Sequence, residues 1–244
     1  MEITALIPTI ITENIDYLFW GALPYGSLGG WLLTLLISLL AGGIASLLGL
    51  LGGIALTLAG DKVKQILNLF IAVLRAIPIL MLIFWMYFLL PVLLGVDIPA
   101  MVAVIFVLSL VSGAYLSQSV YAGITAVSRE QWYAALSLGL SATEALRLVI
   151  LPQALRMMLP SFVNQWITLI KDSSLAYVVG VAEFTFVATQ INNREQVYPL
   201  EIFIILACGY FVLCATIEWF GHYLAHRLQT PVPSTAQNRL WFMQ

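Results

Sequence analysis

The 244-residue chain is strongly apolar: 61% of its residues are hydrophobic and only 9% are charged. A soluble globular domain carries about 25% charged residues, so this composition excludes a soluble enzyme or binding module. The net charge is −2, and no basic run or basic-aromatic patch indicates nucleic-acid binding. The composition instead predicts an integral membrane protein.

Long uncharged stretches separate the few ionisable residues. These stretches run from Asp16 to Asp61, from Arg75 to Asp97 and from Asp97 to Arg129. Each is long enough for a helix of about 20 residues to cross a hydrocarbon core about 30 Å thick. One small domain cannot bury several such stretches, so we interpret them as membrane spans.

Five helical spans are expected, because only helices satisfy every backbone hydrogen bond within apolar runs of this length. In chain order they cover residues 30–58, 66–93, 100–122, 160–181 and 199–224. The first is rich in glycine, which lets helix backbones approach closely, and we interpret it as a tightly packed inner helix. In the second we expect Pro78 to interrupt the helix.

The two ends of the chain are expected to differ. Residues 1–21 lack the basic start and cleavage site of a signal peptide, so we assign them to the mature chain. Residues 1–229 then form a single transmembrane domain. Residues 230–244, which contain Pro231 and Pro233, are interpreted as a flexible cytoplasmic tail.

The placement of lysine and arginine predicts the orientation, since cytoplasmic loops carry an excess of both. With the N-terminus outside and the C-terminus inside, only Arg194 lies on the external side. The cytoplasmic segments then hold Lys62, Lys64, Arg129, Arg147, Arg156, Arg227 and Arg239. The opposite orientation reverses this excess, so we predict the N-out, C-in arrangement.

Residues 123–159 form a long amphipathic excursion between the third and fourth spans. The segment carries charges such as Arg129 and Glu144, yet keeps alanine and leucine at helical spacing until Pro152 and Pro160. We expect these two prolines to break it. A connection of this length with its own structure is usually functional. The alternative is a helix lying on the membrane surface.

This excursion contains the most specific pattern in the chain. Two alanines follow a tyrosine, a glycine follows after three intervening residues, and an apolar pair with proline follows after ten more. The residues are Tyr133, Ala134, Ala135, Gly139, Ile150, Leu151 and Pro152. The pattern resembles the EAA loop of permease subunits of bacterial ATP-binding-cassette importers, although Tyr133 replaces the usual glutamate. The resemblance implies short cytoplasmic helices that dock on a separate ATPase, with Gly139 permitting the turn.

Further stretches resemble the polar amino acid branch (histidine, glutamine and glutamate type) of this permease family. They are Arg75-Ala76-Ile77-Pro78-Ile79-Leu80, then Ala114-Tyr115 followed by Gly123-Ile124 and Gln131, then Lys171-Asp172-Ser173-Ser174-Leu175. Three positions depart from the family pattern. Gln118 stands where glutamate is usual, Tyr121 where arginine is frequent and Ala76 where glycine is usual.

The resemblance implies an all-α, five-span, type I importer permease in the bacterial inner (cell) membrane. It also implies three kinds of partner: ATP-binding-cassette ATPase subunits, a second identical or related permease subunit, and an extracytoplasmic solute-binding protein. The chain has no Gly-rich phosphate loop followed by Lys-Ser or Lys-Thr, so it is not expected to be an enzyme. ATP and magnesium are expected on the partner ATPase, and no cofactor in this chain.

The sequence favours an importer over a secondary carrier, a channel or a membrane enzyme. A secondary carrier usually has more spans and an inverted repeat, which the sequence does not show. A channel needs no docking loop. A membrane enzyme needs a catalytic set, and the two histidines, His222 and His226, lack the glutamate between them that a metalloprotease helix has. We favour packing at the membrane interface as the explanation for the two histidines. Glu218 is the residue that could join them in a metal site.

Charged side chains within the spans are costly and usually functional. Arg75 and Lys171 are expected near the middle of their spans, where either could meet the carboxylate of a passing amino acid. The alternative is internal ion pairing, and we predict that Arg75 pairs with Asp172 and leaves Lys171 facing the pathway. Ser173, Ser174, Tyr115 and Gln118 complete the candidate pathway residues.

The candidate substrate is an amino acid. The stretch from Val178 to Glu183 and the Asn192-Asn193-Arg194 loop resemble the glutamate/aspartate branch most, so an acidic amino acid is favoured. Neutral and basic amino acids remain open alternatives.

The orientation is testable by thiol labelling in intact cells, after Cys208 and Cys214 are replaced by alanine. Single cysteines at Glu13 and Asp97 should react with a membrane-impermeant reagent, and one at Lys62 should not, because only the first two are predicted outside. Labelling at Lys62 alone would contradict the N-out arrangement.

Overall fold

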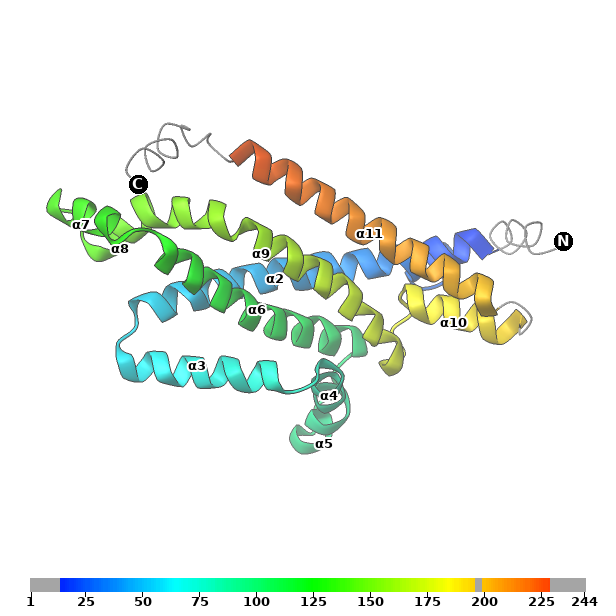
Figure 1. The fold of residues 1–244 in the computed structure, drawn as a ribbon. Coiled ribbons are helices and arrows are strands. Elements are labelled where there is room, and N and C mark those ends of the chain that lie inside the picture. The colour runs from blue at the N-terminus through cyan, green and yellow to red at the C-terminus, as the bar shows by residue number, and fades with distance from the viewer. Residues whose placement is uncertain (1–13, 196–198, 229–244) are drawn as a thin grey trace, which may run out of the picture.

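The computed structural model describes residues 14–195 and 199–228, and within these it is almost entirely helical (Figure 1). Its α-helices are α2 (Gly30–Leu58), α3 (Asp61–Ala76), α4 (Ile79–Phe84), α5 (Leu90–Leu94), α6 (Ala100–Ala126), α7 (Arg129–Ser137), α8 (Ala142–Ala145), α9 (Leu151–Asp172), α10 (Phe184–Glu195) and α11 (Pro199–Leu228). Two π-helical turns and one 3₁₀ helix connect them, at Trp85–Leu89, Leu146–Ile150 and Ser173–Val179. The proposed tail at 230–244 lies outside the described residues.

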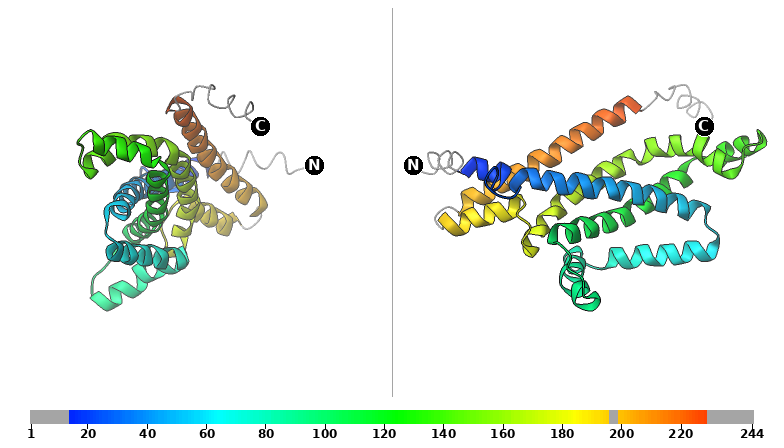
Figure 2. Two further views of the ribbon diagram at one scale, coloured as in Figure 1. Left: turned by 60° about the vertical axis from the view of Figure 1, so that its left-hand side comes forward. Right: turned by 180° about the vertical axis from the view of Figure 1, so that it is seen from behind.

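The long helices lie side by side in one bundle, short helices lie at its two ends, and α4 and α5 project from its side (Figures 1 and 2). Helices α7 and α8 project from one end, which we call the α7 end. Helix α10 and a short helix over residues 14–20 lie at the other, the α10 end. The described residues include four helices long and apolar enough to cross a membrane, and a fifth span if α3 to α5 counts as one.

The second expected span is sharply bent. Helices α3 and α4–α5 meet at 96°. Ile77, with φ −88° and ψ 132°, is in the extended region, which a residue before proline prefers because the proline ring disfavours the helical one. Pro78 therefore ends α3 and starts a new helix in another direction.

The fourth span differs from the expectation at both prolines. Pro152 comes just after the π-helical turn Leu146–Ile150 and does not interrupt the helix. Pro160 lies inside α9 without ending it. Residues Ala142–Val179 therefore form one helix of 38 residues, and the expected helix start at residue 160 is wrong.

Close packing of α2 on α6 forms the centre of the fold. An added Cβ at Gly49 would lie 2.3 Å from the Leu116 Cβ, and one at Gly53 would lie 2.4 Å from Val120. Only glycine permits this approach of the two backbones. The resulting core joins Ile37 and Ala41 with residues of α4, α6 and α9. The expectation of a tightly packed glycine-rich helix agrees with these contacts.

A buried carboxylate fixes α10 against the bundle. Glu183 accepts hydrogen bonds from the backbone N–H groups of Thr185 and Phe186, both at 2.9 Å, and so caps the first turn of α10. The Tyr210 hydroxyl of α11 also donates to it at 2.8 Å. Thr34 of α2 accepts from the Phe184 N–H at 3.0 Å. These contacts tie together α2, α10 and α11.

The α2–α6 contact predicts different effects at two glycines of the same helix. Gly49→Ala should destabilise the protein by about 1–3 kcal/mol, because its methyl group would collide with Leu116. Gly43→Ala should be neutral or stabilising, because an added Cβ there meets nothing within 4 Å. Thermal unfolding of the detergent-purified protein measures both, and equal melting temperatures for the two variants would contradict this packing.

Candidate functional site

The segment between α6 and α9 is a compact helical hairpin at the α7 end. Helix α7 ends near Leu138, whose N–H bonds the Ala134 carbonyl at 3.1 Å. Gly139 follows in the left-handed region with φ +85°, and open space surrounds the position of its missing Cβ. The turn thus needs glycine for its backbone and not for its packing. The glycine turn that the sequence implied is present at this residue.

A capping box starts the next helix. The Glu144 N–H donates to the Ser141 hydroxyl, and the Glu144 carboxylate accepts from the Ser141 N–H at 2.8 Å. These bonds stabilise the carboxylate and lower the pKa of Glu144 below its ordinary value. Ser141 therefore defines where the long helix through α8 and α9 begins.

The hairpin exposes large apolar side chains. Tyr133 is 62% exposed, Leu138 84% and Leu148 61%. Ala134, Gly139 and Pro152 are also exposed, and Leu151 is half-buried. Ala135 and Ile150 are instead buried within this chain. The predicted docking residues thus divide into an exposed set and two that hold the hairpin on the bundle.

Helix α9 has an apolar side against its neighbours and a polar open side. Trp166 packs on Gly42, and its indole N–H donates to the Ser46 hydroxyl of α2 at 3.0 Å. At helical spacing on the opposite side, Asn164, Thr168 and Lys171 are exposed. Within the described part of the chain, neither the Asn164 amide nor the Lys171 ammonium makes a hydrogen bond or ion pair. We call these three residues the polar face of α9.

Helices α3 and α6 are joined by polar pairs that follow one another along their length. Lys64 donates to the Tyr121 hydroxyl and lies 4.4 Å from the centre of that ring. Gln118 donates to Asn68 at 3.0 Å. About two turns further along α3, the Arg75 guanidinium lies 4.4 Å from the centre of the Tyr115 ring. Tyr121 and Gln118, two of the departures from the family pattern, thus serve contacts with α3.

The structure corrects the predicted pairing of Arg75 with Asp172. Among the residues described, these two side chains form no ion pair, and Arg75 lies on Tyr115 instead. The error came from assuming that a cation within a span needs a carboxylate, whereas an aromatic face also attracts it.

The structure places the two candidate pathway serines differently. Ser173 is fully buried, and its hydroxyl donates to the Ile170 carbonyl at 2.7 Å. Ser174 donates to the Lys171 carbonyl at 2.6 Å and is only half-buried. Ser173 is therefore removed from the surface that a solute can reach.

The depth of Lys171 follows from a contact between α6 and α9. Gln165 donates to Ser112 at 3.2 Å, so these residues lie at one depth. Lys171 is six residues further toward the α10 end, and Tyr115 is three residues further toward the α7 end. The nine residues between them correspond to about 13 Å. Arg75 is thus near the middle of the bundle, and Lys171 is nearer the α10 end than the mid-span position expected for it.

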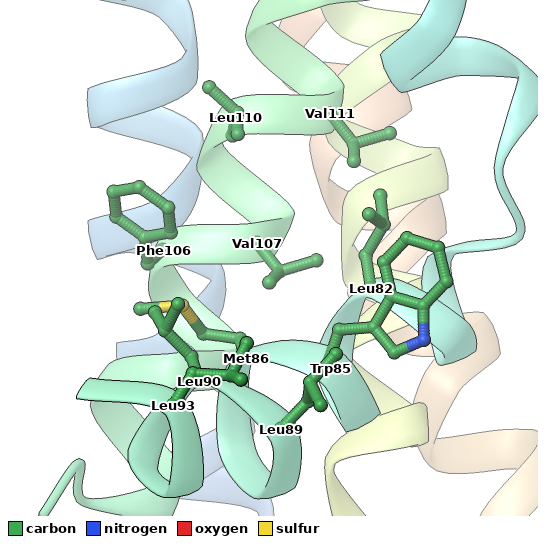
Figure 3. A pocket seen from close by; sticks show the side chains of 10 residues that line it. All are labelled: Leu82, Trp85, Met86, Leu89, Leu90, Leu93, Phe106, Val107, Leu110 and Val111. Carbon is green, nitrogen blue, oxygen red and sulfur yellow. The ribbon is translucent and has the colours of Figure 1, made fainter. Parts of the chain in front are cut away.

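An apolar hollow beside the bend of the second span is unsuited to an amino acid. It lies where the bent α4–α5 arm leaves α6, and Figure 3 shows Trp85, Met86 and Phe106 among its lining side chains. Its volume is about 270 Å³ and its lining is apolar. A zwitterion there would lose its hydration without gaining hydrogen bonds. The polar surfaces of α6 and α9 are therefore the better candidates for solute contact.

Comparison with known proteins identifies the family. Residues 45–230 match the family described as the binding-protein-dependent transport system inner membrane component. The chain belongs to this family. The resemblance to importer permeases and the expected place of the chain in the inner membrane are thereby confirmed.

Individual permeases are similar over most of their length. The glutamine transport system permease protein GlnP of Escherichia coli K12 is 36% identical over 216 residues, covering 86% of this chain and 95% of that protein. The glutamate/aspartate import permease protein GltK of Escherichia coli O157:H7 is 33% identical over 217 residues, with coverages of 84% and 94%.

Solved structures confirm the type I importer permease fold. The crystal structure of an amino acid ABC transporter with histidines superposes with a TM-score of 0.73 at 33% identity, covering 80% of this chain and 91% of that one. The inward-facing MetNI methionine ABC transporter shares the fold with a TM-score of 0.70 at 20% identity, covering 82% and 95%.

The polar face of α9 was missed in the sequence. Asn164 and Thr168 are ordinary residues within an apolar run, and no motif marks them. Their positions seven and three residues before Lys171 were the available signal, since this spacing places all three on one side of a helix.

Proposed function

We propose that this permease forms half of the membrane pathway of an ATP-driven amino acid importer and couples it to a separate ATPase through the α7–α8 hairpin. The observation that carries the proposal is the polar face of α9, which is exposed in an otherwise apolar bundle. An ammonium group facing lipid within a membrane span is costly, so the exposed Lys171 belongs against water, solute or another subunit.

Two copies of the permease, identical or related, would enclose the pathway between their polar faces. A single chain leaves Asn164, Thr168 and Lys171 open on one side. A second subunit opposite would shield them from lipid and leave a polar channel. An extracytoplasmic binding protein would deliver the solute at the α10 end.

The substrate is proposed to be an amino acid with an acidic or neutral polar side chain. The relatives transport glutamine and glutamate/aspartate, which share the α-carboxylate and α-amino groups. Lys171 and Arg75 place positive charge near the open surface, which favours solutes carrying a carboxylate and opposes cationic ones. Basic amino acids are the weaker alternative.

The α7–α8 hairpin supplies the docking surface for the ATPase. The hairpin exposes three large apolar side chains, Tyr133, Leu138 and Leu148. Such exposed apolar side chains on a polar segment are typical of a protein interface. ATP and magnesium would bind to the partner subunit, because this chain has no phosphate-binding loop.

Water access tests the pathway. In the assembled transporter without native cysteines, Asn164→Cys and Thr168→Cys should react with a water-soluble thiol reagent, because thiolates form only in water. Phe211→Cys should not, because Phe211 is a 72% exposed apolar residue of α11 that the proposal assigns to lipid. Equal reaction rates at Thr168 and Phe211 would remove α9 from the pathway.

Coupling is tested at the glycine turn. Gly139→Leu should fold in the membrane, because nothing lies near the missing Cβ, but its positive φ strains the turn. Substrate-driven uptake and stimulated ATP hydrolysis should fall at least tenfold in proteoliposomes. Gly60→Leu is the control, since Gly60 is also uncrowded but has negative φ. Normal uptake by Gly139→Leu would exclude the hairpin as the coupling element, and uptake independent of ATP would favour a channel or carrier.

A further inference from the structure

The break in the second span lies at membrane depth. Helix α3 ends at Ala76, and its last turn contacts Tyr115, which is 15 residues into the 27-residue α6. The break therefore lies near the middle of a helix about 40 Å long. Irregular backbone at this depth is tolerated only within protein or beside a water-filled cavity. In many secondary transporters, interrupted helices near the midplane form solute sites.

The side chain at this break is a cation without an anionic partner. Arg75 is exposed, and within the described part of the chain it forms no ion pair. Its guanidinium lies on the Tyr115 ring at 4.4 Å, which fixes the group while leaving the N–H donors at its edge available. A planar fork of donors held in this way matches a carboxylate, which it can bind through two parallel hydrogen bonds.

We propose that Arg75, held on Tyr115 at the break between α3 and α4, binds the α-carboxylate of the transported amino acid. The proposal rests on the proposed pathway function and names a site within it. Lys171, about 13 Å nearer the α10 end by helix geometry, is the earlier contact for a solute entering from that end. The carboxylate thus meets two cations in succession, the second of them at the middle of the membrane.

A competing explanation is that Arg75 only neutralises the end of α3. Helix C-termini carry partial negative charge, and any cation in the last turn is favourable there. Lysine would serve that purpose as well as arginine, whereas it cannot form the two-bonded fork. Arg75→Lys therefore separates the two explanations.

The chain provides a matched control in Lys64 and Tyr121. This pair also joins a cation of α3 to a tyrosine ring of α6 at 4.4 Å, but eleven residues away from Arg75 toward the α7 end. Lys64→Met removes a similar contact between the helices without touching the break. A loss of binding caused by loosened packing should therefore appear in Lys64→Met as well.

The experiment measures binding of radiolabelled L-glutamine and L-glutamate to the purified permease–ATPase complex in nanodiscs, without binding protein. Arg75→Gln and Arg75→Lys should each weaken binding about tenfold or more, as expected for a lost charge-assisted hydrogen-bonded pair. Tyr115→Phe should retain binding because the ring remains, and Tyr115→Leu should weaken it. Lys64→Met should bind as the unaltered complex does. Thermal unfolding verifies that each variant is assembled.

A protection measurement covers the case in which the Arg75 variants do not assemble. Ser119 lies one turn from Tyr115, and its hydroxyl donates to the Tyr115 carbonyl at 3.4 Å. In a protein that keeps Arg75, L-glutamine or L-glutamate should slow thiol labelling of Ser119→Cys.

The outcomes distinguish a failure of the Arg75 site from a failure of the proposed pathway function. Wild-type affinity in Arg75→Gln, full affinity in Arg75→Lys, an equal loss in Lys64→Met, or unprotected labelling at Ser119→Cys would overturn the Arg75 site. Failure of the unaltered transporter, with its binding protein and ATP, to import any amino acid would instead overturn the pathway function itself.

Discussion

Within hydrocarbon no water is available to a backbone N–H or C=O group, so each must find its partner inside the protein. This requirement makes the spans helical, and it also limits where the chain can leave a helix. The described part of the chain interrupts its second span at Ile77 and Pro78, beside Tyr115 and Arg75. The other polar groups within the bundle fall into two kinds. The Glu183 carboxylate accepts hydrogen bonds from two backbone N–H groups and from a tyrosine hydroxyl, whereas the Lys171 and Asn164 side chains are exposed. Polar groups with hydrogen-bond partners thus hold the helices together, and exposed polar groups mark the surface proposed for the solute.

The bounds of the helices could be predicted where the length of an apolar stretch or a proline determines where a helix begins and ends. The first span was expected at residues 30–58 and α2 occupies Gly30–Leu58, because charge-free sequence and a glycine-rich interior leave no other assignment. Pro78 broke its helix as expected. Pro160 did not, because proline removes one hydrogen bond from α9 and neighbouring helices still hold that helix in place. Sequence alone does not distinguish these two cases, since the difference lies in tertiary contacts.

The candidate site was predictable only where a backbone conformation demanded a particular residue. Gly139 adopts φ +85°, so its place in the turn could be read from the motif. The partner of Arg75 could not be predicted from the sequence. Either an acidic residue or a tyrosine forty residues away can attract the guanidinium, and only the packing of α3 on α6 determines which of them it contacts. Ser173 was expected on the pathway but points into the chain, since a 3₁₀ segment follows α9 and rotates the side chains relative to an α-helix.

The continuous helix from Ala142 to Val179 has a mechanical consequence. Its 38 residues span about 57 Å, and it carries the capped start of the hairpin near one end and Lys171 near the other. Between them Trp166 is fixed to Gly42 and Ser46 of α2, about 36 Å from one end and about 20 Å from the other. Trp166 thus divides the helix into a longer segment on the hairpin side and a shorter segment on the Lys171 side. A tilt about the tryptophan would move the hairpin end nearly twice as far as the other end, so a displacement at the proposed ATPase-docking hairpin would become a smaller one beside Lys171.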